Sequence, residues 1–239
     1  MSNEIQRSIE YVAQYDAAFA HQIRGATAAQ ISRVERALGY PLPPVYRDYL
    51  ERMGSGSDWI GLRQVDFSVD AVAQRLESGD WRPPSPEFTL VGVDRGESFY
   101  DAYLTSSGEL VTIPDLGEAE GEKIADWMQT EAGSMAEWIC GQAFQMLRVR
   151  AKHHRETLIL RQRQEDALAR VAAIVATQPW WFSTAYGSYF EQATANIAIC
   201  ALQPPRRALS LELGAPSESA ANTLRDRFIR ELGMVPYRK

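Results

Sequence analysis

The sequence predicts an α+β fold in two parts. Apolar residues recur at helical spacing in several long segments, and short runs rich in β-branched and aromatic residues lie between turn residues. The charge balance also changes along the chain. Residues 1–150 hold 13 Lys/Arg and 23 Asp/Glu, a balance of −10, whereas residues 151–239 hold 12 and 8, a balance of +4. We therefore expect an α+β domain over 1–148, with helices packed on an antiparallel sheet, and a C-terminal extension over 149–239.

The helices are predicted from apolar spacing together with start and stop signals. Residues 3–24 form the first amphipathic pattern. Thr27 and Gln30 match a capping box that starts a second helix, which Gly39 ends in the left-handed conformation. Further helices are expected from Pro44 to the stop at Gly54, after Ser68, over residues 131–147, from Leu168 to Val175, and after Ser217.

Turn-bounded apolar runs predict the strands. Ser106-Ser107-Gly108 favours a hairpin between two of them. No proline lies between residues 131 and 176, but one helix of that length is unusual in a compact domain, so we expect a break near 150–157. The extension is then a helix, three short strands and a closing helix. The expected strands are Phe88–Val93, Ser98–Leu104, Glu109–Ile113, Phe182–Glu191, Asn196–Leu202 and Ala208–Leu213.

Composition excludes several classes of protein. Hydrophobic residues make up 45% of the chain and charged residues 23%, which is typical of a folded globular protein. The longest apolar runs, such as Val171–Ala176, are too short to span a bilayer. The first twenty residues contain three carboxylates and no apolar block, so we expect no signal peptide and a cytoplasmic location. Cys140 and Cys200 are too few for a disulfide framework, and we expect both to be small buried side chains.

The familiar catalytic motifs are absent from the sequence. There is no Gly-Lys pair for a phosphate-binding loop, and Gly54-Ser55-Gly56 lacks the third glycine of a dinucleotide fingerprint. Tyr186-Gly187-Ser188-Tyr189 lacks the frame of a nucleophile elbow. His153 and His154 are adjacent, so on a helix they would point about 100° apart. We expect no catalytic residues, no metal and no cofactor, with an enzyme lacking a visible motif as the alternative.

One candidate binding feature is acidic. Twelve carboxylates lie between Glu87 and Glu137, against two cations, Arg95 and Lys123. Such a surface speeds association with a basic partner, although it can also be a solvated surface that keeps the protein soluble. The stretch Asp115–Glu122 is favoured because its two glycines suggest an exposed loop. The candidate contact residues are Asp94, Glu97, Asp101, Asp115, Glu118, Glu120 and Glu122.

A second candidate is the aromatic segment, Trp180–Phe190, which contains six aromatic residues. Tyr and Trp are favoured at the centres of protein interfaces, so Trp180, Trp181 and Tyr186 are candidate contact residues. The more economical interpretation is that the segment fills the core of the C-terminal extension. On a strand, however, Trp180 and Trp181 cannot both face inward.

Residues 27–56 contain a spaced motif that resembles a known family. It reads Ile31-x-x-Val34-Glu35-x-x-Leu38-Gly39-x-x-Leu42-Pro43-x-x-Tyr46-x-x-Tyr49-Leu50-x-x-x-Gly54. This resembles the signature of the SUKH superfamily, which includes the Smi/Knr-type proteins. The later Ser-Gly-Glu-Leu-Val hairpin and a helix beginning near Ser134 fit the same order, so the likeness covers about residues 1–147. Met53 departs from the pattern, which usually has Asn there.

The resemblance implies a binding module rather than an enzyme. Bacterial members of this superfamily are commonly immunity proteins that neutralise polymorphic or contact-delivered toxins, and a Smi/Knr-type interaction adaptor is the alternative. The expected partner is a protein toxin with a basic surface, such as one directed at nucleic acid; no direct binding of nucleic acid or membrane is expected. Gly39 and Gly54 would be helix stops and Glu35 a cap or ion-pair partner. The implied core residues are Ile31, Val34, Leu38, Leu42 and Tyr46.

Overall fold

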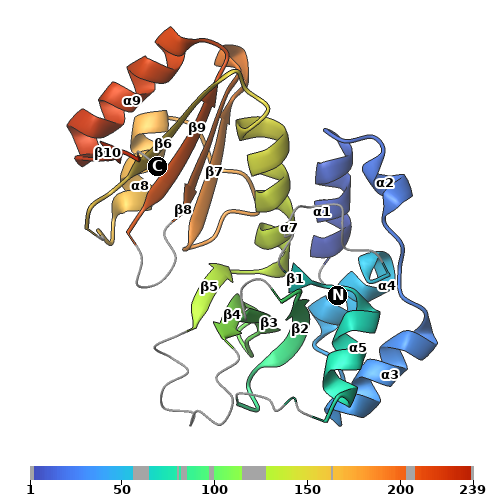
Figure 1. The fold of residues 1–239 in the computed structure, drawn as a ribbon. Helices are drawn as coiled ribbons and strands as arrows, with labels where there is room; N and C mark the ends of the chain where they lie inside the picture. Colours follow the sequence, from blue (N-terminus) through green and yellow to red (C-terminus); the bar gives the residue numbers. More distant parts are fainter. Residues whose placement is uncertain are drawn as a thin grey trace. The chain divides into compact units, whose positions relative to one another are not determined.

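The computed structural model describes residues 3–55, 65–79, 81, 85–96, 100–114, 128–162, 164–202 and 208–237 (Figure 1). The predicted α+β class is confirmed, because the described part combines helices with two five-stranded antiparallel sheets. Residue contacts divide the chain into two compact units, Met1–Ala136 and Glu137–Lys239. Nowhere in the described ranges is a helix both long enough and apolar enough to cross a bilayer.

The first unit begins with helices, and the first prediction among them was wrong. Residues 3–24 form two helices, because the chain leaves the helix after Ala13. The side chain of Asp16 accepts a hydrogen bond from the amide of Ala18 at 3.0 Å, which favours a turn over a continued helix. The helices of this unit are α1 (Glu4–Ala13), α2 (Phe19–Gln22), α3 (Ala28–Leu38), α4 (Pro44–Met53) and α5 (Val69–Glu77).

The predicted helix signals of this unit are confirmed. Thr27 and Gln30 form the capping box of α3, with the amide of Gln30 donating to Oγ1 of Thr27 at 3.3 Å. Gly39 follows α3 with a φ of +80°, in the left-handed conformation. Ser68 caps α5 by accepting a hydrogen bond from the amide of Ala71. The α4 helix ends immediately before Gly54.

The sheet of the first unit is a meander in the order β1-β2-β3-β4-β5. The predicted hairpin joins β3 to β4, with Leu104 opposite Leu110 and Gly108 at a φ of +88°. The edge strands β1 and β5 were not predicted, because they are short and carry few apolar residues. The strands are β1 (Val65–Asp66), β2 (Thr89–Asp94), β3 (Tyr100–Leu104), β4 (Leu110–Pro114) and β5 (Gln129–Ala132).

The second unit contains more strands than the predicted three. Its sheet has the order β10-β6-β9-β8-β7, and β6 lies where we expected only a break between helices. The predicted strand Phe182–Glu191 starts only at Gly187, after a turn. The elements are α7 (Met135–Phe144), η2 (Gln145–Val149, a π-helix), β6 (His154–Ile159), α8 (Ala167–Val175), β7 (Gly187–Gln192), η3 (Ala193–Ala195), β8 (Ile197–Leu202), β9 (Ser210–Ala215), α9 (Glu218–Leu232) and β10 (Val235–Pro236).

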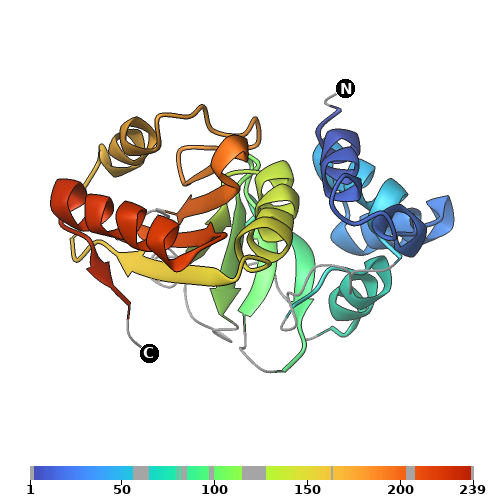
Figure 2. The same cartoon turned by 90° about the horizontal axis from the view of Figure 1, so that it is seen from above.

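The two faces of this second sheet pack on different elements (Figure 2). On one face, residues such as Leu158, Ile199 and Leu211 form a core with α8 and α9. On the other face, η2 packs on β8 and β9, and Arg150, which directly follows η2, pairs with Glu212 of β9 at 3.3 Å. Strand residues alternate between these two environments, as a pleated sheet requires.

The contact-based boundary differs from the predicted domain boundary at residue 148. The expected helix over 131–147 was assigned to the first domain, yet most of α7 belongs to the second unit by its contacts. Glu137 accepts a hydrogen bond from Thr184, and Gly141 lies against the ring of Tyr189. Sequence periodicity marks a helix but not the sheet on which it packs, which is why the boundary falls elsewhere.

Candidate functional site

The acidic run is described at only two of its seven candidate residues. Glu97, Asp115, Glu118, Glu120 and Glu122 lie outside the described residues. Asp101 is only 5% exposed; its carboxylate accepts a hydrogen bond from the amide of Asp94 at 2.9 Å and pairs with Arg75 of α5 at 3.3 Å. The carboxylate of Asp94 accepts from the amide of Gly96. The carboxylate of Asp101 therefore links β3 to β2 and to α5. A partner contact by the run stays a prediction for the other five.

The aromatic segment divides into a buried half and a surface half. Phe182, Tyr189 and Phe190 are at most 4% exposed. The ring of Tyr189 packs against that of Phe182, with centroids 4.9 Å apart, and against that of Phe144 of α7 at 5.7 Å. The interpretation as core is therefore confirmed for these residues. The three candidate contact residues, Trp180, Trp181 and Tyr186, are only partly buried.

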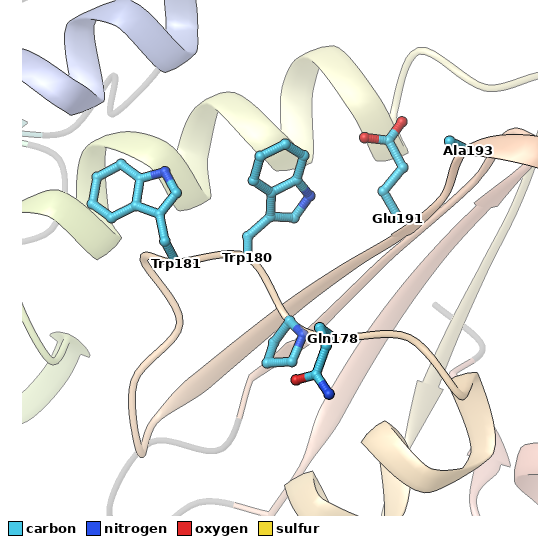
Figure 3. Close-up of a pocket in the computed structure, with 6 residues that line it drawn as sticks. Gln178, Trp180, Trp181, Glu191 and Ala193 are labelled. Carbon is cyan, nitrogen blue, oxygen red and sulfur yellow. The ribbon is translucent and has the colours of Figure 1, made fainter.

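Trp180 and Trp181 extend to the same side of their loop (Figure 3). The sequence argument excluded this for a strand, but the segment is a turn: the amide of Ser183 donates to the carbonyl of Trp180 at 2.9 Å. Both side chains contact Phe182. The Trp180 ring lies 17° from parallel to the Phe182 ring, whereas the Trp181 ring lies 89° from it. The two indoles therefore stand nearly perpendicular to each other.

The two indoles border a shallow pocket of about 300 Å³, here called the Trp pocket. One wall is supplied by β7, through Glu191, whose side chain is only 11% exposed. Oε1 of Glu191 forms an ion pair with Arg148 of η2. Glu191 therefore presents a largely buried, ion-paired carboxylate to the pocket. The lining residues are Gln178, Pro179, Trp180, Trp181, Glu191 and Ala193.

The loop that carries the indoles is anchored by a buried carboxylate. Glu137 of α7 is 1% exposed. Its Oε2 accepts a hydrogen bond from Oγ1 of Thr184 at 2.6 Å, and its Oε1 accepts a longer one from the phenol of Tyr189 at 3.4 Å. The amide of Trp180 in turn donates to the carbonyl of Tyr189 at 2.8 Å. These bonds fix the path of the loop relative to α7 and β7.

Two glycines, Gly187 and Gly141, leave room for the side chains of Glu137 and Tyr189. A methyl group at Gly187 would overlap Oε1 of Glu137, and one at Gly141 would overlap the phenol oxygen of Tyr189. Burial, together with the neighbouring Cys200 and Glu137, raises the pKa of Tyr189 well above its ordinary value. The phenol therefore stays protonated and remains available as a donor to the carboxylate.

Sequence reasoning missed the role of Glu137. It was counted only as the last member of the acidic run, because its partners Thr184 and Tyr189 lie 47 and 52 residues away in the chain. In the sequence, the triplet Gly187-Ser188-Tyr189 indicates only an incomplete nucleophile motif. A carboxylate inside an otherwise apolar helix stretch was the available signal, since such a residue is seldom buried without a partner.

The remaining candidate chemistry concerns thiols and metal ligands. Cys140 and Cys200 are both buried, as predicted, and burial raises the pKa of the Cys200 thiol far above its ordinary value. Within the described residues, no cluster of three or more His, Cys, Asp or Glu side chains is placed to hold a metal ion.

Glu35 and four of the five implied core residues of the motif have the structural roles that the resemblance implies. Oε1 of Glu35 accepts a hydrogen bond from the amide of Leu42 at 3.0 Å and pairs with Arg47, and these two contacts lower the pKa of Glu35. Leu38, expected in the core, is only partly buried, because it lies in the last turn of α3. The other four implied core residues are buried. No family model matches the chain, and no curated protein matches it either.

Proposed function

We propose that this protein is an immunity protein that acts in the cytoplasm by binding a cognate polymorphic or contact-delivered toxin and occluding its active site. The observation that carries the proposal is the pair Trp180 and Trp181, held partly exposed on a loop that Glu137 anchors. Partly exposed tryptophans that border a pocket are typical of the anchor residues of protein interfaces. The kind of partner follows from the resemblance of residues 27–56 to the SUKH signature.

The fixed loop suits the affinity that such a function requires. Stoichiometric neutralisation needs a dissociation constant near 1 nM, or about −12 kcal/mol. Interfaces of about 1,600 Å² reach this value when they contain well-packed aromatic anchors. A loop that is already ordered before binding avoids part of the entropy cost of association. The hydrogen bonds from Thr184 and Tyr189 to Glu137, and from the amide of Trp180 to the carbonyl of Tyr189, supply that order in advance.

The charge of the chain supports a basic partner. The net charge is −6, and the balance over residues 1–150 is −10. Toxins that act on nucleic acid need positive surfaces to attract phosphate. An acidic protein is steered toward such a surface and away from nucleic acid itself. The partner we propose is therefore a toxin with a basic active-site surface.

The experiment pairs this chain with the protein encoded by the adjacent gene. Cells that produce that protein should stop growing, and co-production of this chain should restore growth. The purified proteins should form a 1:1 complex with nanomolar affinity, and the complex should lack toxin activity. A neighbour that is not toxic, or a toxin whose activity is unchanged by a molar excess of this chain, would contradict the proposal and favour an adaptor.

A further inference from the structure

The Trp pocket combines two kinds of group that recognise the same ligand chemistry. Its aromatic walls are the indoles of Trp180 and Trp181, which stand nearly perpendicular to each other. Its polar wall is the carboxylate of Glu191, of which Oε1 pairs with Arg148. A carboxylate that lines a pocket and can accept further hydrogen bonds favours a ligand that brings a donor.

Aromatic faces select for cations. A cation placed over the face of an indole is attracted by the ring quadrupole, and the attraction increases as water is excluded. A planar guanidinium can stack on one indole and still direct its N–H groups, which lie in its plane, toward a carboxylate. An ammonium group is a compact, strongly hydrated charge and cannot stack in this way.

We propose that the Trp pocket receives one arginine side chain of a partner protein, with the guanidinium stacked on an indole and donating to the carboxylate of Glu191. The inference rests on the proposed function only for the identity of the protein that carries this arginine. A basic toxin surface offers such side chains. The volume of about 300 Å³ is at the lower end of the range for ligand pockets, which suits one side chain better than a larger molecule.

Other occupants fit the pocket less well. An anionic group would meet the carboxylate of Glu191 at close range. An apolar side chain would cover the indoles but would offer no hydrogen-bond donor to the carboxylate. Arg148 pairs with Glu191, so with an arginine bound the carboxylate would bridge two guanidinium groups.

The first experiment uses small probes and needs no toxin. N-acetyl-arginine methylamide is titrated into the full chain, and its binding is followed by saturation-transfer NMR. Matched titrations use the norleucine analogue, which has no charge, and the lysine analogue, whose charge is not planar. We expect the arginine probe to bind about tenfold more tightly than the norleucine probe, with lysine between them. Equal binding of arginine and norleucine, or tighter binding of lysine, would overturn the proposal.

Variants then locate the binding. E191Q removes the charge, and we expect it to weaken binding of the arginine probe about tenfold or more. The matched control is E212Q, because Glu212 also pairs with an arginine, Arg150, but does not line the pocket. W181L removes one aromatic wall and leaves the Arg148–Glu191 ion pair in place. If E191Q fails to fold, W181L alone tests whether the arginine probe binds in the pocket. Unchanged probe binding by folded E191Q and W181L would contradict the assignment.

The toxin experiment separates this inference from the proposed function. If the arginine probe binds in the Trp pocket but the neighbouring protein is not a toxin, the arginine site stands and the immunity function fails. If the toxin binds the wild type, E191Q and W181L with equal affinity, the immunity function stands and the pocket is not the interface. A toxin affinity that falls in E191Q and W181L, but not in E212Q, supports both.

Discussion

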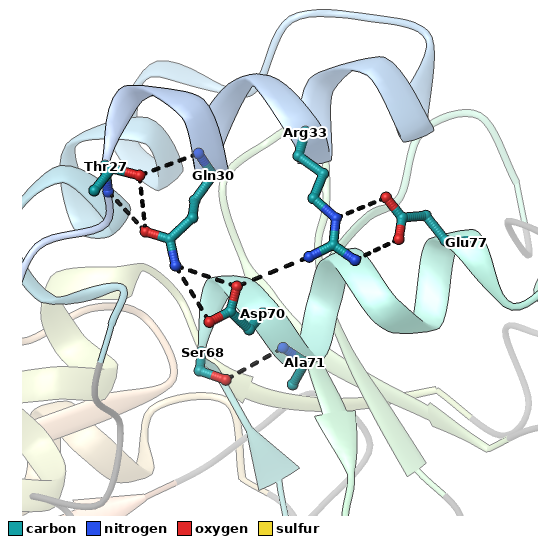
Figure 4. A network of polar contacts seen from close by, with 7 residues as sticks. All are labelled: Thr27, Gln30, Arg33, Ser68, Asp70, Ala71 and Glu77. Atoms are coloured by element: carbon teal, nitrogen blue, oxygen red, sulfur yellow. Dashed lines mark hydrogen bonds and ion pairs between the residues drawn. The ribbon is translucent and has the colours of Figure 1, made fainter.

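Two carboxylates that join elements, Glu77 in the first unit and Glu137 in the second, lie in opposite environments. In the first unit, Glu77 of α5 binds Arg33 of α3 through two contacts of 2.8 and 2.5 Å, and Asp70 accepts from Gln30 at 3.2 Å (Figure 4). The Arg33 and Glu77 side chains are 40% and 44% exposed. In the second unit, Glu137 of α7 is 1% exposed.

The difference determines what each carboxylate can do. In the exposed network, water solvates the same groups when the contacts break, so the network adds little to stability and mainly sets how α3 lies against α5. The buried Glu137 has no such replacement, so Thr184 and Tyr189 would lose their acceptor inside the protein. The second arrangement is therefore the one able to fix the shape of a binding loop.

The largest expected effect follows from removing the buried anchor. E137A should lower the free energy of unfolding by about 3 kcal/mol, because two donors lose a buried carboxylate and a cavity forms. E137Q keeps the shape and one acceptor, so it should lose less than E137A. Chemical denaturation of the three proteins provides the measurement. Equal stability of E137A and the wild type would contradict the conclusion that Glu137 anchors the loop.

The next effect concerns the close approach at Gly187. G187A should lower the free energy of unfolding by about 2 kcal/mol, since the methyl group would overlap Oε1 of Glu137. Because the loop must shift to relieve the overlap, binding of the arginine probe should weaken as well. Denaturation and probe titration test the two effects separately. Q178A, at an exposed position in the same loop, is the control for stability.

A smaller effect depends on pH in the first unit. The amide of Leu42, followed by Arg47, lowers the pKa of Glu35 from its ordinary value of 4.5. A lowered pKa in the folded state stabilises the protein above pH 4.5, and this contribution is lost as the pH falls through the folded-state pKa. At pH 7, E35Q should therefore be about 0.5–1 kcal/mol less stable than the wild type. The difference should shrink as the pH approaches 3 in parallel denaturation curves.

The smallest effect is expected in the exposed network. E77Q should change the melting temperature by about 1 °C or less, because the Arg33–Glu77 pair is open to solvent. Any change should be smaller at high salt, which screens exposed charges. A loss comparable to that of E137A, measured in the same thermal scans, would show that exposure does not separate the two carboxylates.

Local signals explain which parts of the fold were predictable. The capping residues Thr27, Ser68 and Ser217 act on amides within three residues, so a single sequence contains the whole interaction. The strand β6 escaped prediction because its polar side chains are satisfied at a distance: Glu156 pairs with Arg225 of α9. Nothing near residue 156 in the chain signals that partner.

The candidate site shows the same limit. Composition alone singles out Trp180 and Trp181 as candidate contact residues. The sequence predicts a strand from Phe182, however, and so gives no sign of the turn that places both indoles on one side. Glu191 was not singled out, because its environment depends on Arg148 of η2 and on the loop before β7. These contacts arise only when separate elements pack together.

The most direct test of the binding account is the dissociation rate of the cognate toxin complex. W181L should dissociate at least about tenfold faster than the wild type, because an aromatic anchor at an interface governs how long the complex lasts. W81L, which alters a partly buried tryptophan of the first unit, should dissociate at the wild-type rate once thermal melts show both variants folded. Equal dissociation rates for W181L and the wild type would contradict the claim that this loop binds the partner.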